Sequence, residues 1–172
     1  MCSFSPADPS GKLPPIEERV RQYLIESARK ADPNRPFEAT VTYGHLCSAI
    51  DPDEHYWAYP RFRGIGKVLL HVSTVEHEAG RPLLSALVVL QTNHRASDGF
   101  AVLARGLGFG IQPGQENAFW REQVEAVVRY WTGEGRDVPS LTPRERALAK
   151  LAVMAEDIAE IRRILGEEDE KE

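Results

Sequence analysis

The stretch RPLLSALVVLQ, residues 81–91, places one polar side chain, Ser85, within a run of aliphatic residues. Gly80 and Pro82 end any preceding helix, because glycine is the usual residue after a helix C-terminus and proline cannot continue one. The run that follows is aliphatic and β-branched without polar alternation, which is typical of a short strand buried on both faces. The sequence therefore predicts a buried central strand. It leaves open whether Ser85 has a chemical role or is a small residue that fits the core.

Residues with helical periodicity lie on both sides of this run. Upstream, apolar residues recur at spacings of three or four over residues 14–31, and Thr42 is suited to cap a short helix that ends at Ile50. Downstream, the Ala and Leu content of residues 100–109 favours a short helix after a polar loop, and residues 116–131 are strongly helical. We therefore expect an α+β fold that is mostly α, with a small sheet.

A long helix is predicted immediately before the central run, over residues ~61–79. Its apolar stripe is spaced by three or four residues and consists of Phe62, Ile65, Leu69, Val72 and Val75. Arg63 and Lys67 are four residues apart and would share a different face. Gly64 and Gly66 each lower helix propensity by up to ~1 kcal/mol, which indicates that a neighbouring element approaches the backbone closely there.

The C-terminal part of the chain predicts a further helix, residues 142–166, after a linker at residues 132–141. It begins with TPRE, which has the form of a capping box with proline in the first turn. We expect this helix to bury one apolar face, either against the rest of the chain or against a second copy, and both alternatives remain open. That face carries Leu148, Leu151, Ile158 and Ile161. Residues 1–13 are expected to form a flexible tail, and residues 167–172 an acidic tail.

Composition and charge restrict the class of protein. The chain has 172 residues, of which 42% are hydrophobic and 27% charged, as in a soluble globular protein with one well-buried domain. No apolar run reaches the ~18 residues of a membrane span, and the N-terminus lacks the pattern of a signal peptide, so we expect a cytoplasmic protein that does not bind membranes. A formal charge of −5 argues against nucleic-acid binding by the whole surface. Residues 61–67, however, carry three positive charges and no negative one.

No metal or cofactor is predicted. The five histidines and two cysteines do not fall at the i, i+3 or i, i+4 spacing of helical zinc ligands. Residues 108–114, GFGIQPG, contain three glycines but lack the lysine and the helix of a phosphate loop. Cys2 and Cys47 are too few and too dissimilar in context for a disulfide framework, and Cys47 is expected to be a small core residue.

Four short pieces of the chain follow one another in the order that is typical of a DNA-repair family. The pieces are VTY with Tyr43, RGIG with Arg63, LSALVV with Ser85, and SDGF with Gly99 and Phe100. On these pieces, residues ~41–104 resemble the C-terminal half of the O6-alkylguanine-DNA alkyltransferases and of their catalytically inactive alkyltransferase-like relatives. The resemblance implies a winged-helix-like core at residues ~37–108, within a domain of residues 14–131. We expect one helix before this core and two after it, the second being the C-terminal helix at residues 142–166.

The resemblance also implies roles for single residues. In this family a tyrosine presses on a DNA phosphate and an arginine enters the base stack in place of a rotated nucleotide, roles that would fall to Tyr43 and Arg63. At the position of the family's Cys-His pair this chain has Ser85 and Ala86, so the thiolate nucleophile and its base are both missing. We therefore expect no alkyl transfer, and we interpret Ser85 as a small residue satisfied by a backbone hydrogen bond.

These observations lead to three hypotheses of function. The first is a non-enzymatic winged-helix protein that binds double-stranded DNA, or acts as a regulator, through Tyr43, Arg61, Arg63 and Lys67. The second is a protein-interaction module or dimeric adaptor without nucleic-acid binding, whose C-terminal helix binds another protein or a second copy. The third is an enzyme of unknown reaction that uses His or Asp residues around positions 94–98.

Overall fold

Helices dominate the described part of the chain. The computed structural model describes residues 13–53 and 64–133 and the four further positions 151, 155, 158 and 162. In chain order the elements are α1 (Pro15–Lys30), η1 (Pro36–Ala39), β1 (Val41–Thr42), α2 (Tyr43–Ile50), α3 (Ile65–Glu78), η2 (Leu84–Leu87), β2 (Val88–Val89), α4 (Asp98–Gly106) and α5 (Glu116–Thr132), where η denotes a 3₁₀ helix. The α+β, mostly α fold with a small sheet is therefore confirmed.

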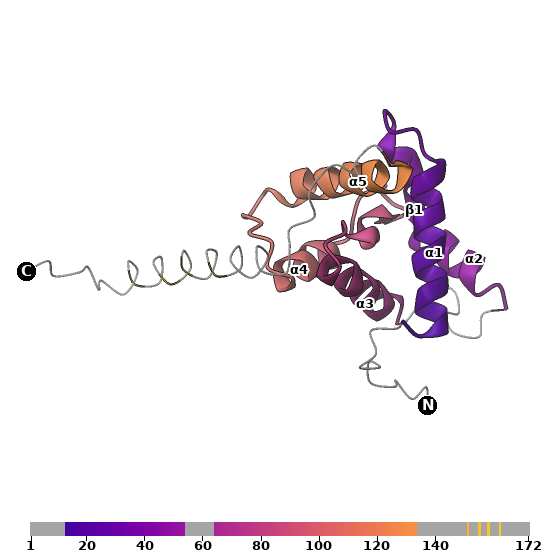
Figure 1. Cartoon of the computed structure of the whole chain (residues 1–172), viewed down its shortest axis with the longest axis horizontal. Helices are drawn as coiled ribbons and strands as arrows, with labels where there is room; N and C mark the ends of the chain where they lie inside the picture. Colours follow the sequence, from indigo (N-terminus) through magenta and orange to yellow (C-terminus); the bar gives the residue numbers. More distant parts are fainter. Residues whose placement is uncertain are drawn as a thin grey trace, which may run out of the picture.

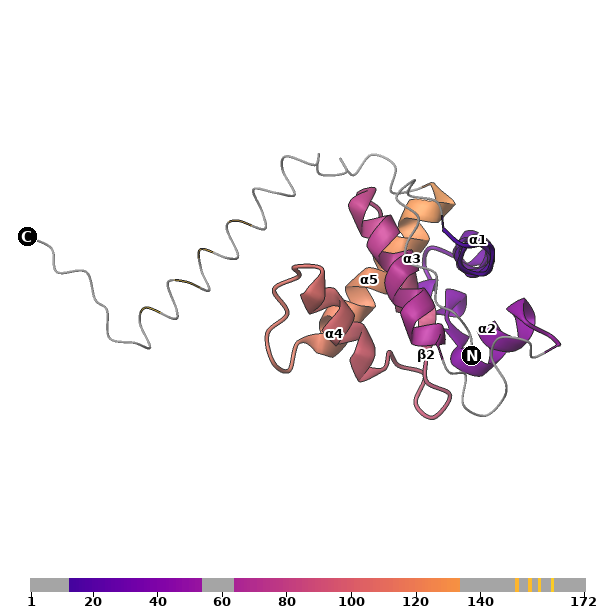
Figure 2. The same cartoon turned by 90° about the horizontal axis from the view of Figure 1, so that it is seen from below.

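The central run lies in the middle of the core. In Figure 1, the long helices α1, α3 and α5 form a triangle around η2 and the two strands. Every residue from Leu83 to Val89 is buried, as predicted. The two strands are parallel, and their register pairs Val41 with Val88 and Thr42 with Val89. Figures 1 and 2 place α4 and α2 on opposite sides of α3.

The expectation of a continuous strand in this run is wrong. Only Val88 and Val89 are extended, whereas residues 84–87 form a 3₁₀ turn closed by a hydrogen bond from Ala86 N to Leu83 O of 3.0 Å. The carbonyl of Ala86 accepts a hydrogen bond of 2.9 Å from Trp120 Nε1. Because the partner strand β1 has only two residues, the buried polar groups of the remaining run must be satisfied by a turn and by side chains.

Four helix predictions are confirmed with small shifts of their ends. α1 has proline in its first turn, acidic residues at its N-terminus and basic residues at its C-terminus, which suits the helix dipole. Thr42 caps α2, since its side chain accepts a hydrogen bond of 3.2 Å from His45 N. The predicted helices at 100–109 and 116–131 correspond to α4 and α5.

Cys47 is a buried core residue, as expected. Burial is the main cause of a raised pKa of its thiol, about 12, and the charge of Asp51 adds to the effect.

The long helix before the central run begins later than expected. Gly64 has a φ of 96°, a left-handed conformation that glycine adopts readily, and α3 begins after it at Ile65. The expectation that Arg63 and Lys67 share one helical face depends on Arg63, which lies outside the described residues. A Cβ added to Gly66 would meet no atom within 4 Å, so the expected close approach of a neighbour is also wrong there.

The C-terminus of α3 is well defined. Gly80 has a φ of 74°, and hydrogen bonds run from Gly80 N to His77 O and from Arg81 N to Glu76 O, at 2.9 and 2.8 Å. This pattern is a Schellman motif, which satisfies the last carbonyls of a helix. It also turns the chain so that the Arg81 side chain reaches back to Glu76.

A buried carboxylate connects α1 with α3. Glu76 is fully buried, and its two oxygens accept hydrogen bonds from Arg21 Nε at 2.6 Å and from Arg81 Nε at 2.5 Å. Arg81 adds a second hydrogen bond of 2.9 Å through its terminal nitrogen. The guanidinium of Arg21 also lies 5.9 Å from the centre of the Trp131 ring, which brings the end of α5 into the same cluster.

The predicted C-terminal helix falls mostly outside the described residues, as do the tail at residues 1–12, residues 134–141 of the predicted linker and the acidic tail. The four described positions are helical and exposed, with Leu151 at 60% and Ile158 at 51% of full exposure. At these two positions the chain itself therefore does not bury the predicted apolar face. None of the described helices has the length and apolar character needed to cross a membrane.

Candidate functional site

Two of the four predicted DNA-contacting residues lie within the described chain. Tyr43 is the first residue of α2 and is half-buried. Lys67 is in the first turn of α3 and is exposed. Arg61 and Arg63 lie outside the described residues, as does the aromatic cluster at 56–62.

The hydroxyl of Tyr43 marks a junction between two helix N-termini. Tyr43 Oη lies 3.0 Å from Ser97 Oγ, a distance that fits a hydrogen bond in which either group can donate. Ser97 occupies the N-cap position of α4, and its side chain makes no capping hydrogen bond there. Residues 54 positions apart in the sequence thus bring the first turn of α2 to the start of α4.

A tight polar loop, residues 91–97, precedes this junction. Leu90 N donates to Arg95 O at 2.8 Å, and His94 N donates to Leu90 O at 2.9 Å. Arg95 N donates to Asn93 Oδ1 at 3.1 Å, and His94 has a φ of 51°. Left-handed backbone at a non-glycine residue is uncommon, so the surrounding hydrogen bonds hold this loop in one shape. Gly99 and Phe100, which the resemblance assigns to a wing, lie instead in α4.

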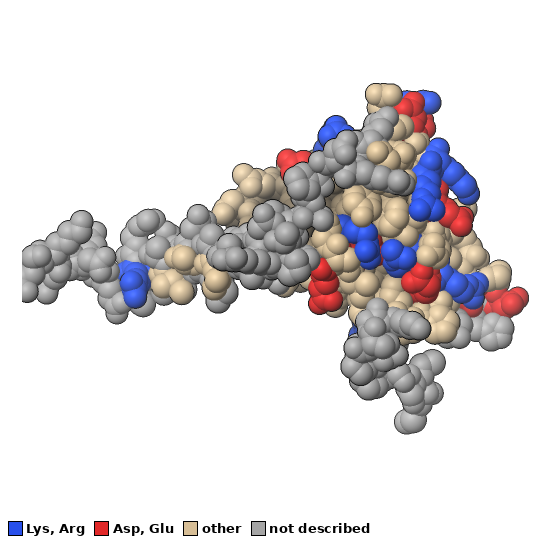
Figure 3. Space-filling model, viewed as in Figure 1, with Lys and Arg blue, Asp and Glu red and all other residues tan. Residues whose placement is uncertain are grey.

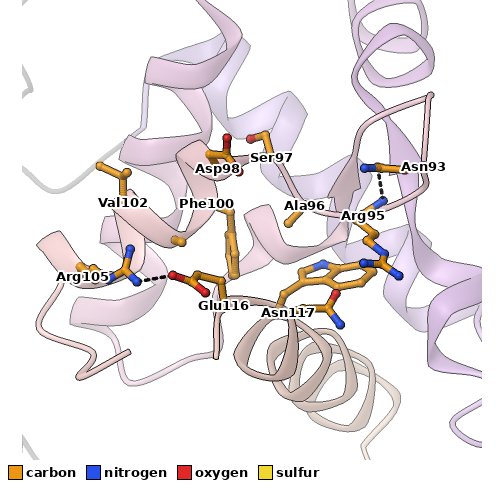
Figure 4. Close-up of a pocket in the computed structure, with 12 residues that line it drawn as sticks. Asn93, Arg95, Ala96, Ser97, Asp98, Phe100, Val102, Arg105, Glu116 and Asn117 are labelled. Carbon is orange, nitrogen blue, oxygen red and sulfur yellow. Dashed lines mark hydrogen bonds and ion pairs between the residues drawn. The ribbon is translucent and has the colours of Figure 1, made fainter. Parts of the chain in front are cut away.

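A hollow of about 420 Å³ opens between this loop, α4 and the start of α5. Phe100 and Trp120 contribute aromatic rings to its wall, and Asn93, Arg95, Asp98 and Asn117 contribute polar groups. Figure 4 shows Arg95 and Asn117 toward one end and the ion pair of Arg105 with Glu116 toward the other. Polar side chains, among them Ser97 and Asp98, thus line the hollow together with the two aromatic rings.

The two arginines of the hollow differ in charge balance. Arg105 is neutralised by Glu116, with 2.6 Å between guanidinium nitrogen and carboxylate oxygen. The hydrogen bond from Arg105 is the main cause of a lowered pKa of Glu116, so this carboxyl remains ionised at neutral pH. Arg95 has no carboxylate within ion-pair distance among the residues that the structure describes. No pattern in the sequence singles out Arg95, although it stands in the polar loop that is expected after the central run.

Ser85 is bonded to a second buried serine. Ser73 Oγ donates to Ser85 Oγ at 2.7 Å, and Ser85 N donates to Ser73 Oγ at 3.2 Å. Both serines are buried. The interpretation of Ser85 as a small residue of the core is supported, but the partner of its hydroxyl is the Ser73 side chain and not the expected backbone group.

Cations and anions alternate on the face over α1. Figure 3 shows blue and red side chains interleaved there. Lys30 pairs with Glu26 at 3.9 Å, and Arg35 pairs with Glu38 at 2.8 Å. Arg29 lies 5.5 Å from the centre of the Trp131 ring. This face therefore presents a mixed charge, which does not attract a polyanion strongly.

Within residues 13–53 and 64–133 and the four helical positions beyond them, no three His, Cys, Asp or Glu side chains gather as metal ligands would. His71 and Glu17 form a pair of such residues, in which Nδ1 and Oε2 are 2.5 Å apart. This pair joins α3 to α1. Comparison of the chain with protein-family models, with curated proteins and with solved structures found no match.

Proposed function

We propose that this protein is a non-enzymatic DNA-binding or regulatory protein. In this proposal Tyr43 and Lys67, with Arg61 and Arg63 of the preceding segment, contact the backbone of double-stranded DNA. The observation that carries the proposal is the contact between the Tyr43 and Ser97 side chains, whose hydroxyl oxygens are 3.0 Å apart. This contact brings together the first turns of α2 and α4. Hydroxyl groups and the backbone N–H groups of a first helical turn are common donors to DNA phosphates, and such contacts position a duplex without reading its sequence.

The distribution of charge supports DNA binding by a small part of the protein surface and not by a broad face. The formal charge of −5 and the paired ions over α1 oppose binding by that face. Lys67 is exposed, and residues 61–67 include three cations. We therefore expect few phosphate contacts and a shallow salt dependence, with a log–log slope of about −0.9 for each phosphate neutralised.

The test is a salt titration of binding to duplex DNA by fluorescence anisotropy. Lys67→Ala should weaken binding and reduce the magnitude of the log–log slope by about 0.9, because one phosphate contact is lost. Lys30→Ala is the matched control, since it removes the same charge from the α1 face, where Lys30 pairs with Glu26. Tyr43→Phe, which keeps the ring and removes the hydroxyl, should weaken binding without changing the slope.

Two results would contradict the proposal. One is the absence of duplex binding at about 50 mM salt, where electrostatic binding is strong. The other is an equal loss of affinity in the Lys67 and Lys30 variants, which would show that only the net charge matters. Circular dichroism of each variant checks that the fold is intact.

A second candidate function is self-association through the C-terminal helix. Leu151 and Ile158 are 60% and 51% exposed and lie seven residues apart, as in a heptad. Leu151→Asp should shift a dimer toward the monomer in sedimentation velocity, because a charge at such a contact is costly to bury. Leu70→Asp, at a residue of α3 that is 46% exposed, is the control and should leave the assembly unchanged. A wild-type protein that sediments as a monomer at about 100 µM, a concentration far above the Kd of a stable dimer, would exclude this candidate.

A further inference from the structure

The hollow beside the 91–97 loop has the size and the rigid walls of a small-molecule site. Its volume of about 420 Å³ lies within the usual range for such sites. Trp120 is fixed by the hydrogen bond of 2.9 Å from its Nε1 to Ala86 O. Phe100 is packed against Phe119, with 6.0 Å between ring centres. Both walls are therefore in place before a ligand arrives, which reduces the entropic cost of binding.

The polar groups of the hollow favour an anion at one end. Arg105 already pairs with Glu116, whereas Arg95 has no described carboxylate as a partner. The backbone of Arg95 is held by hydrogen bonds from both sides of the loop, directly after the left-handed His94. Strained residues held in this way are common in ligand clamps. Figure 4 shows the Arg95 side chain directed toward Asn117, whose amide can donate to the same ligand group.

The acids of the hollow limit how much negative charge a ligand can carry. Asp98 lines it with a negative charge, and Glu116 already pairs with Arg105. Among the described lining residues, Arg95 alone is therefore left to balance a ligand, and one with several negative charges, such as a nucleoside triphosphate, would not be neutralised. A carboxylate matches the planar fork of one guanidinium. We propose that the hollow binds a small monocarboxylate with a flat apolar body, in which Arg95 pairs with the carboxylate and the rings of Phe100 and Trp120 contact the body. This site goes beyond the proposed DNA contact and does not depend on it.

The test uses the full-length protein and 2-naphthoate as the probe, with neutral 2-naphthamide as its isostere. In a ¹⁵N NMR titration, naphthoate should shift the backbone signals of residues 91–97 and the indole N–H of Trp120. It should bind at least tenfold more tightly than the amide, because a charge-assisted hydrogen bond is lost with the amide.

Three variants separate the site from general charge effects. Arg95→Gln should raise the Kd for naphthoate about tenfold and leave that for naphthamide unchanged. Arg129→Gln is the matched control, because Arg129 is on the same helix as Asn117 but about 18 Å further along its axis, and it should have no effect. Asp98→Asn removes a repelling charge and should lower the Kd for naphthoate. Unchanged melting temperatures establish that each variant is folded.

Several outcomes would overturn the proposal. They are equal affinity for the acid and the amide, equal losses in the Arg95 and Arg129 variants, and NMR shifts confined to residues outside the hollow. A Kd for naphthoate above about 10 mM would also exclude it, since a ligand of this size in a formed site should bind more tightly. Failure of DNA binding alone would leave the carboxylate site intact, because the two assays measure different ligands.

Discussion

Replacing Glu76 with Gln is expected to lower the free energy of unfolding by about 3 to 5 kcal/mol, because it removes the negative partner of a buried ion pair and leaves the positive one in place. Glu76 is fully buried, and three hydrogen bonds of 2.5 to 2.9 Å tie it to Arg21 and Arg81. The hydrogen bond with Glu76 is the main cause of a raised pKa of Arg81. Because a guanidinium is protonated at neutral pH even without such a partner, Arg81 remains charged when Glu76 is lost. The amide of glutamine offers one acceptor oxygen and no charge. Among the described residues, this leaves Arg81 without a carboxylate partner and Arg21 with only the more exposed Glu18.

The matched control is Glu18→Gln, which removes the other carboxylate that contacts Arg21. This pair has a distance of 3.3 Å, and the Glu18 side chain is 42% exposed. Exposed ion pairs contribute at most about 1 kcal/mol, so this variant should unfold close to the wild type in urea. If Glu76→Gln also cost less than about 1 kcal/mol, the buried cluster would not connect α1 to α3 as its geometry indicates.

The helices are predictable from the sequence because their signals are local. Apolar spacing of three or four residues predicts α1 and α5, and Thr42 predicts the start of α2 from the chemistry of a single cap. Burial of residues 83–89 is predictable for the same reason, since an unbroken aliphatic run has no polar face.

The extension of the central strand and the start of α3 are not predictable in this way. A buried aliphatic run forms a strand only as far as a partner accompanies it, and β1 pairs with only Val88 and Val89. The length of β1 is set elsewhere in the chain. Glycine can occupy a helix interior, at a cost in helix propensity, or a left-handed position next to a helix end. Gly64 adopts the second of these conformations, and local propensity does not distinguish the two.

The candidate sites depend on pairs that are distant in sequence. Tyr43 and Ser97 are 54 residues apart, and Arg21 and Glu76 are 55 residues apart. No periodicity links such pairs, and each residue alone is an ordinary polar side chain. Arg95 stands out only when the loop turns its side chain toward the start of α5, as Figure 4 shows. Local pattern therefore predicts elements, whereas the sites require the tertiary arrangement.

The pair of Ser73 and Ser85 should respond asymmetrically to alanine substitution. Ser73 Oγ is the acceptor for Ser85 N and the donor to Ser85 Oγ, at 3.2 and 2.7 Å. Ser73→Ala therefore leaves a buried N–H without an acceptor, at a cost of about 1 to 3 kcal/mol. The better helix propensity of alanine returns a few tenths of a kcal/mol at this position in α3. We expect a net loss of about 2 kcal/mol in the free energy of unfolding.

Ser85→Ala should cost less than about 1 kcal/mol, because it removes only an acceptor. The Ser73 hydroxyl can then donate to the carbonyl four residues earlier in its own helix, as Thr74 does to Leu70 at 2.9 Å. The double alanine variant should resemble Ser73→Ala, since the N–H of Ser85 lacks an acceptor in both. Urea unfolding of the three variants measures the difference. Equal losses in the two single variants would mean that the Ser85 hydroxyl has a partner of its own, and Ser85 would again be a candidate for a chemical role.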